Sequence, residues 1–153
     1  SEEHRKIMGD NDVTTYDLCF NRDQEKRKLF DLCDNADEGE ESLKELRQWL
    51  LRNKHEKKYF KAAAMYRDHE RNRCTLHVVL EKKLPVDILE TILIHAPMAA
   101  NVKSANGVTL LHWAMVGGVS LDIVQALVKA YPESSRMLDQ QGFSPLHWAC
   151  YCG

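Results

Sequence analysis

Apolar residues recur in the second half of the chain in short blocks with helical spacing, and turn residues separate the blocks. One six-residue pattern occurs three times, with a single His in the same place of each copy. The copies are Cys74-Thr75-Leu76-His77-Val78-Val79, Thr109-Leu110-Leu111-His112-Trp113-Ala114 and Ser144-Pro145-Leu146-His147-Trp148-Ala149. The three His residues therefore stand 35 residues apart. A fixed period of this length is typical of repeat architectures, and the pattern predicts units of turn, helix, turn and helix.

The repeat predicts where helices begin and end. We expect a first helix (helix A) at about residues 75–81, 110–116 and 145–151, and a second (helix B) at about 86–95 and 121–130. Thr109 and Ser144 are N-cap residue types whose hydroxyl accepts a helix N–H. Pro97 and Pro132 should end the B helices. Five residues before each His, a turn position that favours positive φ holds Asn72, Gly107 or Gly142.

The first half of the chain follows no such period. Residues 1–21 are polar and predict an extended or partly ordered arm. A helix is expected from about residue 22 to 33, with Leu29, Phe30 and Cys33 on its apolar side. Ser42-Leu43-Lys44-Glu45 has the form of a capping box and predicts a second helix from about residue 43 to 53. Together, residues 22–68 form a helical cap or a diverged first repeat.

The stretch Gly142-Phe143-Ser144-Pro145-Leu146-His147-Trp148-Ala149 resembles the G-x-T-P-L-H-x-A signature of the ankyrin repeat. The resemblance implies an all-α fold, an ankyrin-like helix-turn-helix solenoid with a helical N-terminal cap. It divides the chain into repeats at 69–104 and 105–139 and a partial repeat at 140–153 that stops after helix A. The 35-residue period is longer than the usual one of about 33. The helix B ending Ala130-Tyr131-Pro132-Glu133 is similar to a variant found in algal ankyrin proteins.

The same resemblance implies a non-enzymatic protein–protein interaction or scaffold module. Such arrays bind protein partners through the turn tips and the concave side of the A helices. The candidate partner-binding positions are Glu70, Arg71, Arg73, Ala105, Asn106, Val108, Gln140, Gln141 and Phe143. Two alternatives remain open, a regulatory or targeting segment of a larger enzyme or channel, and a structural subunit of a large assembly.

Composition narrows the choice of partner. The net charge of −2 is too weak to indicate a nucleic-acid or membrane partner, so we expect no nucleic-acid binding and no membrane insertion. Residues 1–73 nevertheless hold 16 of the 21 Lys and Arg residues, and their basic stretch from Arg52 to Lys61 is expected to be a solvated loop, with a patch for an acidic partner as the alternative. Five cysteines without paired spacing predict reduced thiols and an intracellular location, cytoplasmic or nuclear, with an organelle as the alternative. No apolar run approaches the ~20 residues that cross a bilayer.

Several histidines and cysteines are of residue types that act in catalysis or bind metals, but their positions in the repeats indicate structural roles. Stacked repeats would hold His77, His112 and His147 about 10 Å apart, too far to share a metal ion. The resemblance implies that each His bonds to backbone between neighbouring repeats. Cys150 and Cys152 are a poor chelating pair on a helix, so buried or partly buried free thiols are expected. We therefore predict no catalytic residue, cofactor, metal site or small-molecule substrate.

Two further expectations concern the tryptophans of the repeats and the third helix A. Trp113 and Trp148 are predicted to fill the core between stacked helices. The third helix A needs cover on its apolar side, because single repeat units cannot bury their own faces. We expect further repeat sequence, or another subunit, to cover Leu146 to Tyr151.

Overall fold

A computed structural model describes residues 15–36, 39–104 and 106–152, and within the first helix it describes the side chains of residue 24 and residues 26–34. The described residues form eight α-helices and two 3-10 helices and contain no strand. The elements are α1 (Thr15–Asp34), α2 (Glu40–Asn53), α3 (Lys57–Ala64), α4 (Thr75–Glu81), α5 (Val86–His95), η2 (Pro97–Asn101), α6 (Leu110–Gly117), α7 (Leu121–Ala130), η3 (Pro132–Arg136) and α8 (Pro145–Cys152). None of these helices is long and apolar enough to cross a membrane.

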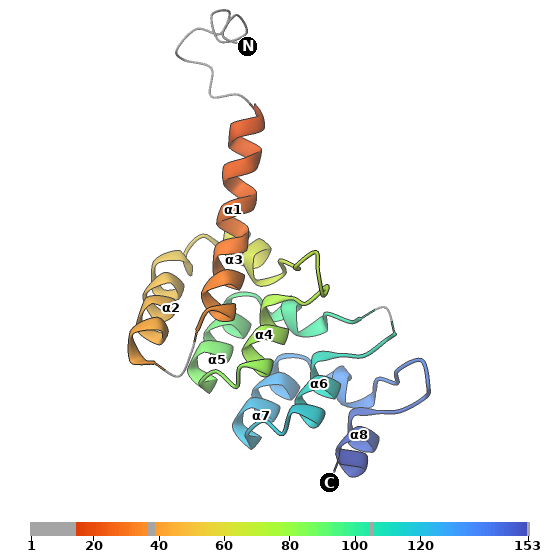
Figure 1. Cartoon of the computed structure of the whole chain (residues 1–153). Coiled ribbons are helices and arrows are strands. Elements are labelled where there is room, and N and C mark those ends of the chain that lie inside the picture. Colours follow the sequence, from red (N-terminus) through yellow and green to blue (C-terminus); the bar gives the residue numbers. More distant parts are fainter. Residues whose placement is uncertain (1–14, 37–38, 105, 153) are drawn as a thin grey trace, which may run out of the picture.

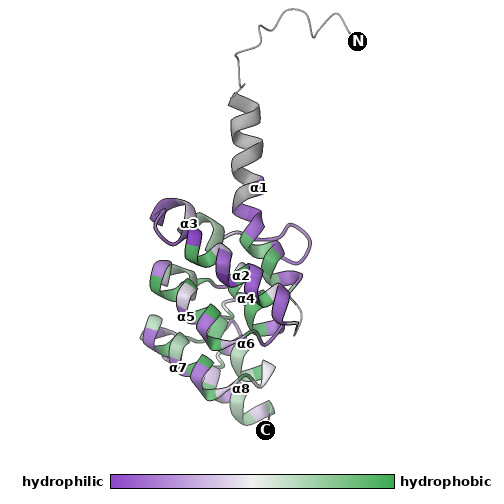
Figure 2. Cartoon of the chain, turned by 90° about the vertical axis from the view of Figure 1, so that its left-hand side faces the viewer, coloured by the Kyte–Doolittle hydropathy of each residue, from purple (hydrophilic) through white to green (hydrophobic). Residues whose placement is uncertain are grey.

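The helices stack in two rows (Figures 1 and 2). One row contains α4, α6 and α8, the A helices of the three repeat units, and the other contains the B helices α5 and α7. The cap extends both rows, because α1 packs against α4 and α3 packs against α5. Helix α2 lies outside the rows, against α1 and α5. The repeat array with its cap is thus an all-α solenoid, as the sequence predicted.

The repeat helices lie close to their predicted positions. Both B helices have the predicted bounds, and Pro97 and Pro132 follow after one intervening residue as the first residues of η2 and η3. Asn72, Gly107 and Gly142 have φ values of 53°, 74° and 83°, which confirms the positive φ expected at this turn position. The helix A predictions are confirmed to within one residue at the C-terminal end.

The predicted starts of two helices in the cap were wrong. Helix α1 begins at Thr15 instead of residue 22, in a stretch without Gly or Pro to stop it. Ser42 does not cap α2, because the helix starts at Glu40 with Gly39 as its N-cap. Glu40 and Glu41 then occupy the first turn, where carboxylates interact favourably with the positive end of the helix dipole.

The basic stretch, expected to be a loop, contains the end of α2 and the start of α3. Phe60, Ala63 and Ala64 form an apolar face of helical spacing and are fully buried, while Lys57, Lys58 and Lys61 remain exposed. The density of lysines hid this short apolar face in the sequence. Of the predicted arm at residues 1–21, residues 15–21 are helical and belong to α1, and residues 1–14 lie outside the described residues.

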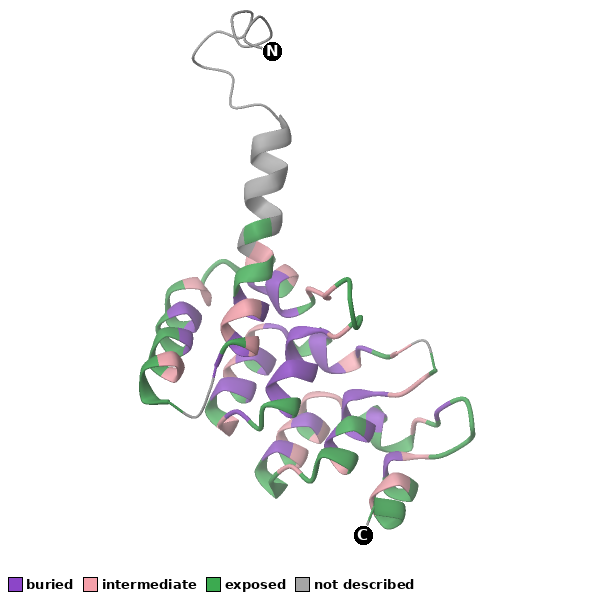
Figure 3. Ribbon diagram, viewed as in Figure 1, coloured by how far each residue is buried: buried purple, intermediate pink, exposed green. Residues whose placement is uncertain are grey.

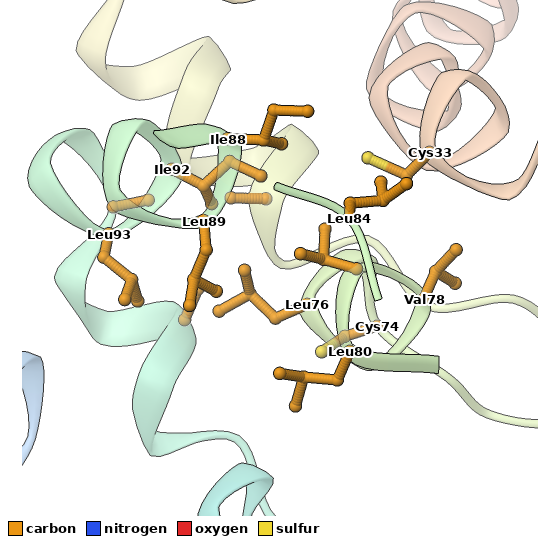
Figure 4. Packing of buried hydrophobic residues seen from close by; sticks show 14 of the residues in the cluster. Cys33, Cys74, Leu76, Val78, Leu80, Leu84, Ile88, Leu89, Ile92 and Leu93 are labelled. Atoms are coloured by element: carbon orange, nitrogen blue, oxygen red, sulfur yellow. The ribbon is translucent and has the colours of Figure 1, made fainter. Parts of the chain in front are cut away.

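One hydrophobic core runs through the cap and the first two repeats. Leu76 of α4 and Leu89 of α5 point toward each other, and Leu84 lies beside Cys33 of α1 (Figure 4). Leu29, Phe30 and Cys33 are buried as predicted, and so are Leu46, Trp49 and Leu50 of α2. Burial decreases toward α8, where Leu146 is 70% exposed (Figure 3).

Candidate partner-binding surface

The three turns that precede the A helices share one construction. Turn 1 spans residues 68–73, turn 2 residues 104–108 and turn 3 residues 139–143. Each begins with a side-chain oxygen that accepts two backbone N–H groups from the same turn. Asp68 Oδ1 accepts from Arg71 and Arg73, Ser104 Oγ from Asn106 and Val108, and Asp139 Oδ1 from Gln141 and Phe143, over distances of 2.8–3.2 Å. These bonds fix the turn tips, because short polar side chains can replace backbone partners in turns.

Neighbouring turns are tied to each other. The N–H of Gln140 in turn 3 donates to the carbonyl of Asn106 in turn 2 at 3.0 Å. Arg67, the residue before turn 1, donates through Nη2 to the carbonyl of Lys103, the residue before turn 2, at 3.0 Å. Gly107 lies so close to turn 3 that a Cβ there would stand 3.4 Å from the Cα of Asp139. The tips therefore form a continuous edge along the array, on the side of the A helices (Figure 1).

Within the described residues, His77 and His147 bond to backbone only inside their own repeat. The bond between neighbouring repeats that the resemblance implied for each His is made by His112. Its Nε2 donates to the carbonyl of Phe143 in the next repeat at 3.1 Å, since a carbonyl can only accept. Its Nδ1 then accepts the N–H of Thr109 at 3.2 Å. Ser144 and His147 pair in the same way, and Ser144 Oγ also accepts the His147 N–H at 3.4 Å, the capping bond predicted for this residue.

His77, like His112, is buried. Its Nδ1 accepts the N–H of Cys74 at 3.2 Å and lies 3.0 Å from the Cys74 Sγ, where the other repeats have a hydroxyl. Burial, reinforced by the positive charges of Arg67 and Arg73, lowers the pKa of His77 to about 4. Its ring is therefore neutral at physiological pH, and the described residues contain no cluster of His, Cys, Asp and Glu that could hold a metal ion.

Among the predicted partner-binding positions, Arg73 has a different environment from the rest. Its side chain is only 19% exposed and binds Asp68 at 3.1 Å, Glu81 at 2.7 Å and Asp34 of α1 at 3.5 Å. Its guanidinium carbon also lies 5.6 Å from the centre of the Phe30 ring. Arg73 thus connects α1, turn 1 and α4, and little of its side chain is accessible to a protein partner.

The other predicted positions lie at the turn tips. Glu70, Arg71, Asn106, Gln140, Gln141 and Phe143 are exposed, and Val108 is half-buried. Ala105 lies outside the described residues. The structure brings Gln140 beside Asn106 through their backbone bond, whereas turns 1 and 3 lie at opposite ends of the array (Figure 1).

Sequence reasoning missed a group of exposed apolar residues on the A helices. Trp113 was expected in the core, but it is 49% exposed and meets the His77 ring edge-on. Val116 is 46% exposed and Tyr151 is 92% exposed. Both stand four residues after the repeat His, where α4 has Glu81. A lone charge in the otherwise apolar α4 was the available signal that this position faces solvent.

A hollow of about 650 Å³ lies beside turn 3. It is lined by Val116 of α6, by Asp139, Gln141 and Phe143 of turn 3, and by His147, Trp148, Tyr151 and Cys152 of α8. Cys150 and Cys152 were expected to be buried or partly buried, but both are exposed because no described element packs over this side of α8. The hollow combines turn-tip residues with the exposed side of the A helices.

Asp139 connects turn 3 to α8 at the hollow. Its Oδ2 accepts a hydrogen bond from Trp148 Nε1 at 2.9 Å, while Oδ1 accepts the two N–H groups within turn 3. Burial alone would raise its pKa, but the hydrogen bonds from Phe143, Trp148 and Gln141 hold the pKa below the usual value. The carboxylate therefore stays ionised and fixes Trp148 against the turn.

The character of this surface changes along the array. Turn 1 and the end of α4 present charged side chains, namely Glu70, Arg71, Glu81 and Lys82. At the matching positions the third repeat has Gln140, Gln141, Tyr151 and Cys152. A partner that lies along the whole edge would meet charge at one end and an apolar, partly aromatic surface at the other.

Comparison with known proteins agrees with this architecture. The family model described as ankyrin repeats, in three copies, matches residues 76–153. The chain belongs to the ankyrin repeat family. Neither the curated proteins nor the solved structures contain a match. Ankyrin repeats are generally protein–protein interaction modules and are typically non-enzymatic.

Proposed function

We propose that this ankyrin chain is a non-enzymatic interaction module that binds a protein partner through its turn tips and the concave side of its A helices. The observation that carries the proposal is the hollow beside turn 3. It joins the predicted tip residues Gln141 and Phe143 to the exposed apolar side chains of Val116 and Tyr151. Exposed apolar surface rimmed by polar residues marks interaction sites on soluble domains.

The rigidity of the surface supports the same function. Turn 3 is fixed by the bonds of Asp139, and α8 is tied to it through Trp148. A pre-organised surface loses little conformational entropy when a partner binds. Aromatic side chains such as Phe143 and Tyr151 are the types that contribute most to binding energy at interfaces.

The proposal can be tested with matched baits. The wild-type chain, the double variant Phe143→Ala/Tyr151→Ala and the control Leu121→Ala are used to isolate partners from an extract of the source cells. Leu121 is 68% exposed but lies on α7, in the other row of helices. We expect partners that bind the wild-type and control chains but are lost from the double variant, with a purified partner binding it at least about tenfold more weakly.

Denaturant unfolding of each bait checks that the fold is intact. Replacing these exposed side chains should change the unfolding free energy by only about 0.5 kcal/mol each. Partners that bind all three baits equally would contradict the proposed surface.

A further inference from the structure

The hollow beside turn 3 offers apolar side chains and no free charge. Its lining contains one carboxylate, that of Asp139, and no Lys or Arg. Asp139 is already engaged, because both of its oxygens accept hydrogen bonds from the chain itself. The volume of about 650 Å³ lies in the range of ligand sites, ~300–1,000 Å³, and exceeds what one side chain fills. An uncharged occupant with more than one apolar group fits this lining.

The backbone of turn 3 has no N–H left for a partner. The N–H groups of residues 139–144 all donate within the chain. Their acceptors are, in order, the Phe143 carbonyl, the Asn106 carbonyl, Asp139 Oδ1, the Asp139 carbonyl, Asp139 Oδ1 and His147 Nδ1. An extended peptide that binds by adding a strand needs free backbone donors as well as acceptors along an edge. Turn 3 offers none of the donors.

A helical partner needs no such donors, because an α-helix satisfies its own backbone groups and presents side chains only. Side chains at positions i and i+4 lie ~5–6 Å apart on one face of a helix. The hollow runs from Val116 on α6 to Tyr151 on α8, two packed helices whose axes are ~8–10 Å apart. Two neighbouring apolar side chains of one helix face fit within this span.

We propose that the hollow takes an amphipathic helix of the protein partner, which inserts two apolar side chains one helical turn apart. This inference rests on the proposed function and specifies the form of the partner at that site. The polar tip residue Gln141 is exposed and lines the hollow, where it would meet the polar flank of the helix.

Two peptide display libraries of equal length test the proposal against the whole chain. The first has a helix-forming framework of Ala, Glu, Lys and Gln, with four randomised positions at i, i+3, i+4 and i+7. The second has the same number of randomised positions but a Pro at every fourth residue, which prevents helix formation. We expect binders from the first library only, with apolar residues selected at i and i+4.

Variants then locate the binding. Val116→Asp and Tyr151→Asp should each weaken the selected helices at least about tenfold, by placing a charge against their apolar face. The control Leu121→Asp, which puts the same charge on an exposed apolar position of α7, should leave affinity within about twofold.

The alternative outcomes are distinguishable. Binders that come from the proline library and weaken with Val116→Asp would overturn the helical partner but leave the proposed surface in place. Helical binders that are insensitive to Val116→Asp and Tyr151→Asp would overturn the assignment of the helix to this hollow. A failure to obtain binders from either library also counts against the inference, whereas the proposed function is judged separately by the natural partners of the matched baits.

Discussion

At the scale of single residues, Lys83 has a backbone conformation that suits glycine better. Its φ is 52°, and Gly118, at the equivalent position 35 residues later, has a φ of 57°. Both follow helix A, at the position where a left-handed residue commonly ends a helix. For a side chain with a Cβ this conformation is unfavourable by about 1–2 kcal/mol. The C-terminal end of helix A is therefore less stable in the first repeat than in the second.

We expect Lys83→Gly to raise the free energy of unfolding by about 0.5–1 kcal/mol, since the relief of strain exceeds the added entropy of the unfolded chain. Gly118→Lys should lower it by a similar amount. A Cβ at Gly118 would meet no atom within 4 Å, so only the backbone conformation is tested there. Urea unfolding measures both changes. Shifts of the same sign in the two variants would show that the left-handed conformation is not the cause.

At the scale of elements, the repeat helices were predictable and the cap was not. The period carries its own check, because turn, helix and proline positions recur in the first two repeats, and this predicted α5 and α7 residue for residue. The cap contains no second copy for comparison. The start of α2 depended on Gly39 and two glutamates instead of Ser42, and α3 depended on a short apolar face between lysines.

The candidate site was predictable at its tips and not on its helices. The match to the repeat pattern places Gln141 and Phe143 on turn 3, because turn geometry is set by nearby residues. The exposure of Val116 and Tyr151 depends on which side of helix A faces the neighbouring helices, and that is decided by packing between repeats. The role of Arg73 was hidden for the same reason, since its partner Asp34 lies 39 residues earlier in the chain.

The Arg73 contacts predict how α1 is attached to the repeats. We expect Arg73→Ala to lower the free energy of unfolding by about 1–2 kcal/mol, because Asp68 and Asp34 lose a shared, partly buried partner. Arg73→Lys should recover only part of this loss, since a single ammonium cannot bind three carboxylates as a guanidinium does. Hydrogen exchange of α1 amides should increase in both variants.

Arg71→Ala is the matched control for this experiment. Arg71 is exposed in the same turn, and the bond that it makes to Asp68 comes from its backbone N–H, which Ala retains. Its unfolding free energy should stay within about 0.5 kcal/mol of the wild type. Equal losses in the Arg71 and Arg73 variants would mean that charge in turn 1, and not the contact with α1, supports the cap.

At the scale of the whole molecule, equivalent positions differ in burial along the array. Leu76, Leu111 and Leu146 occupy the same place in three repeats and are 0%, 4% and 70% exposed. Leu111 is buried because α6 lies between α4 and α8, while α8 is the last helix described. Stability in such an array comes from each repeat packing on its neighbours. The same substitution should therefore have a different effect at each place.

We expect Leu111→Asp to destabilise the chain by at least about 3 kcal/mol, because an unpaired carboxylate enters the stack and a cavity is left behind. Ala114→Asp, at a site that is 1% exposed, should have a similarly large effect. Leu146→Asp should change stability by only about 0.5 kcal/mol, as should Gln140→Ala and Gln141→Ala at the exposed tips. Chemical denaturation ranks the variants. A loss at Leu146 as large as that at Leu111 would show that α8 is covered in solution, by a second copy of the chain or by a rearranged end of the array.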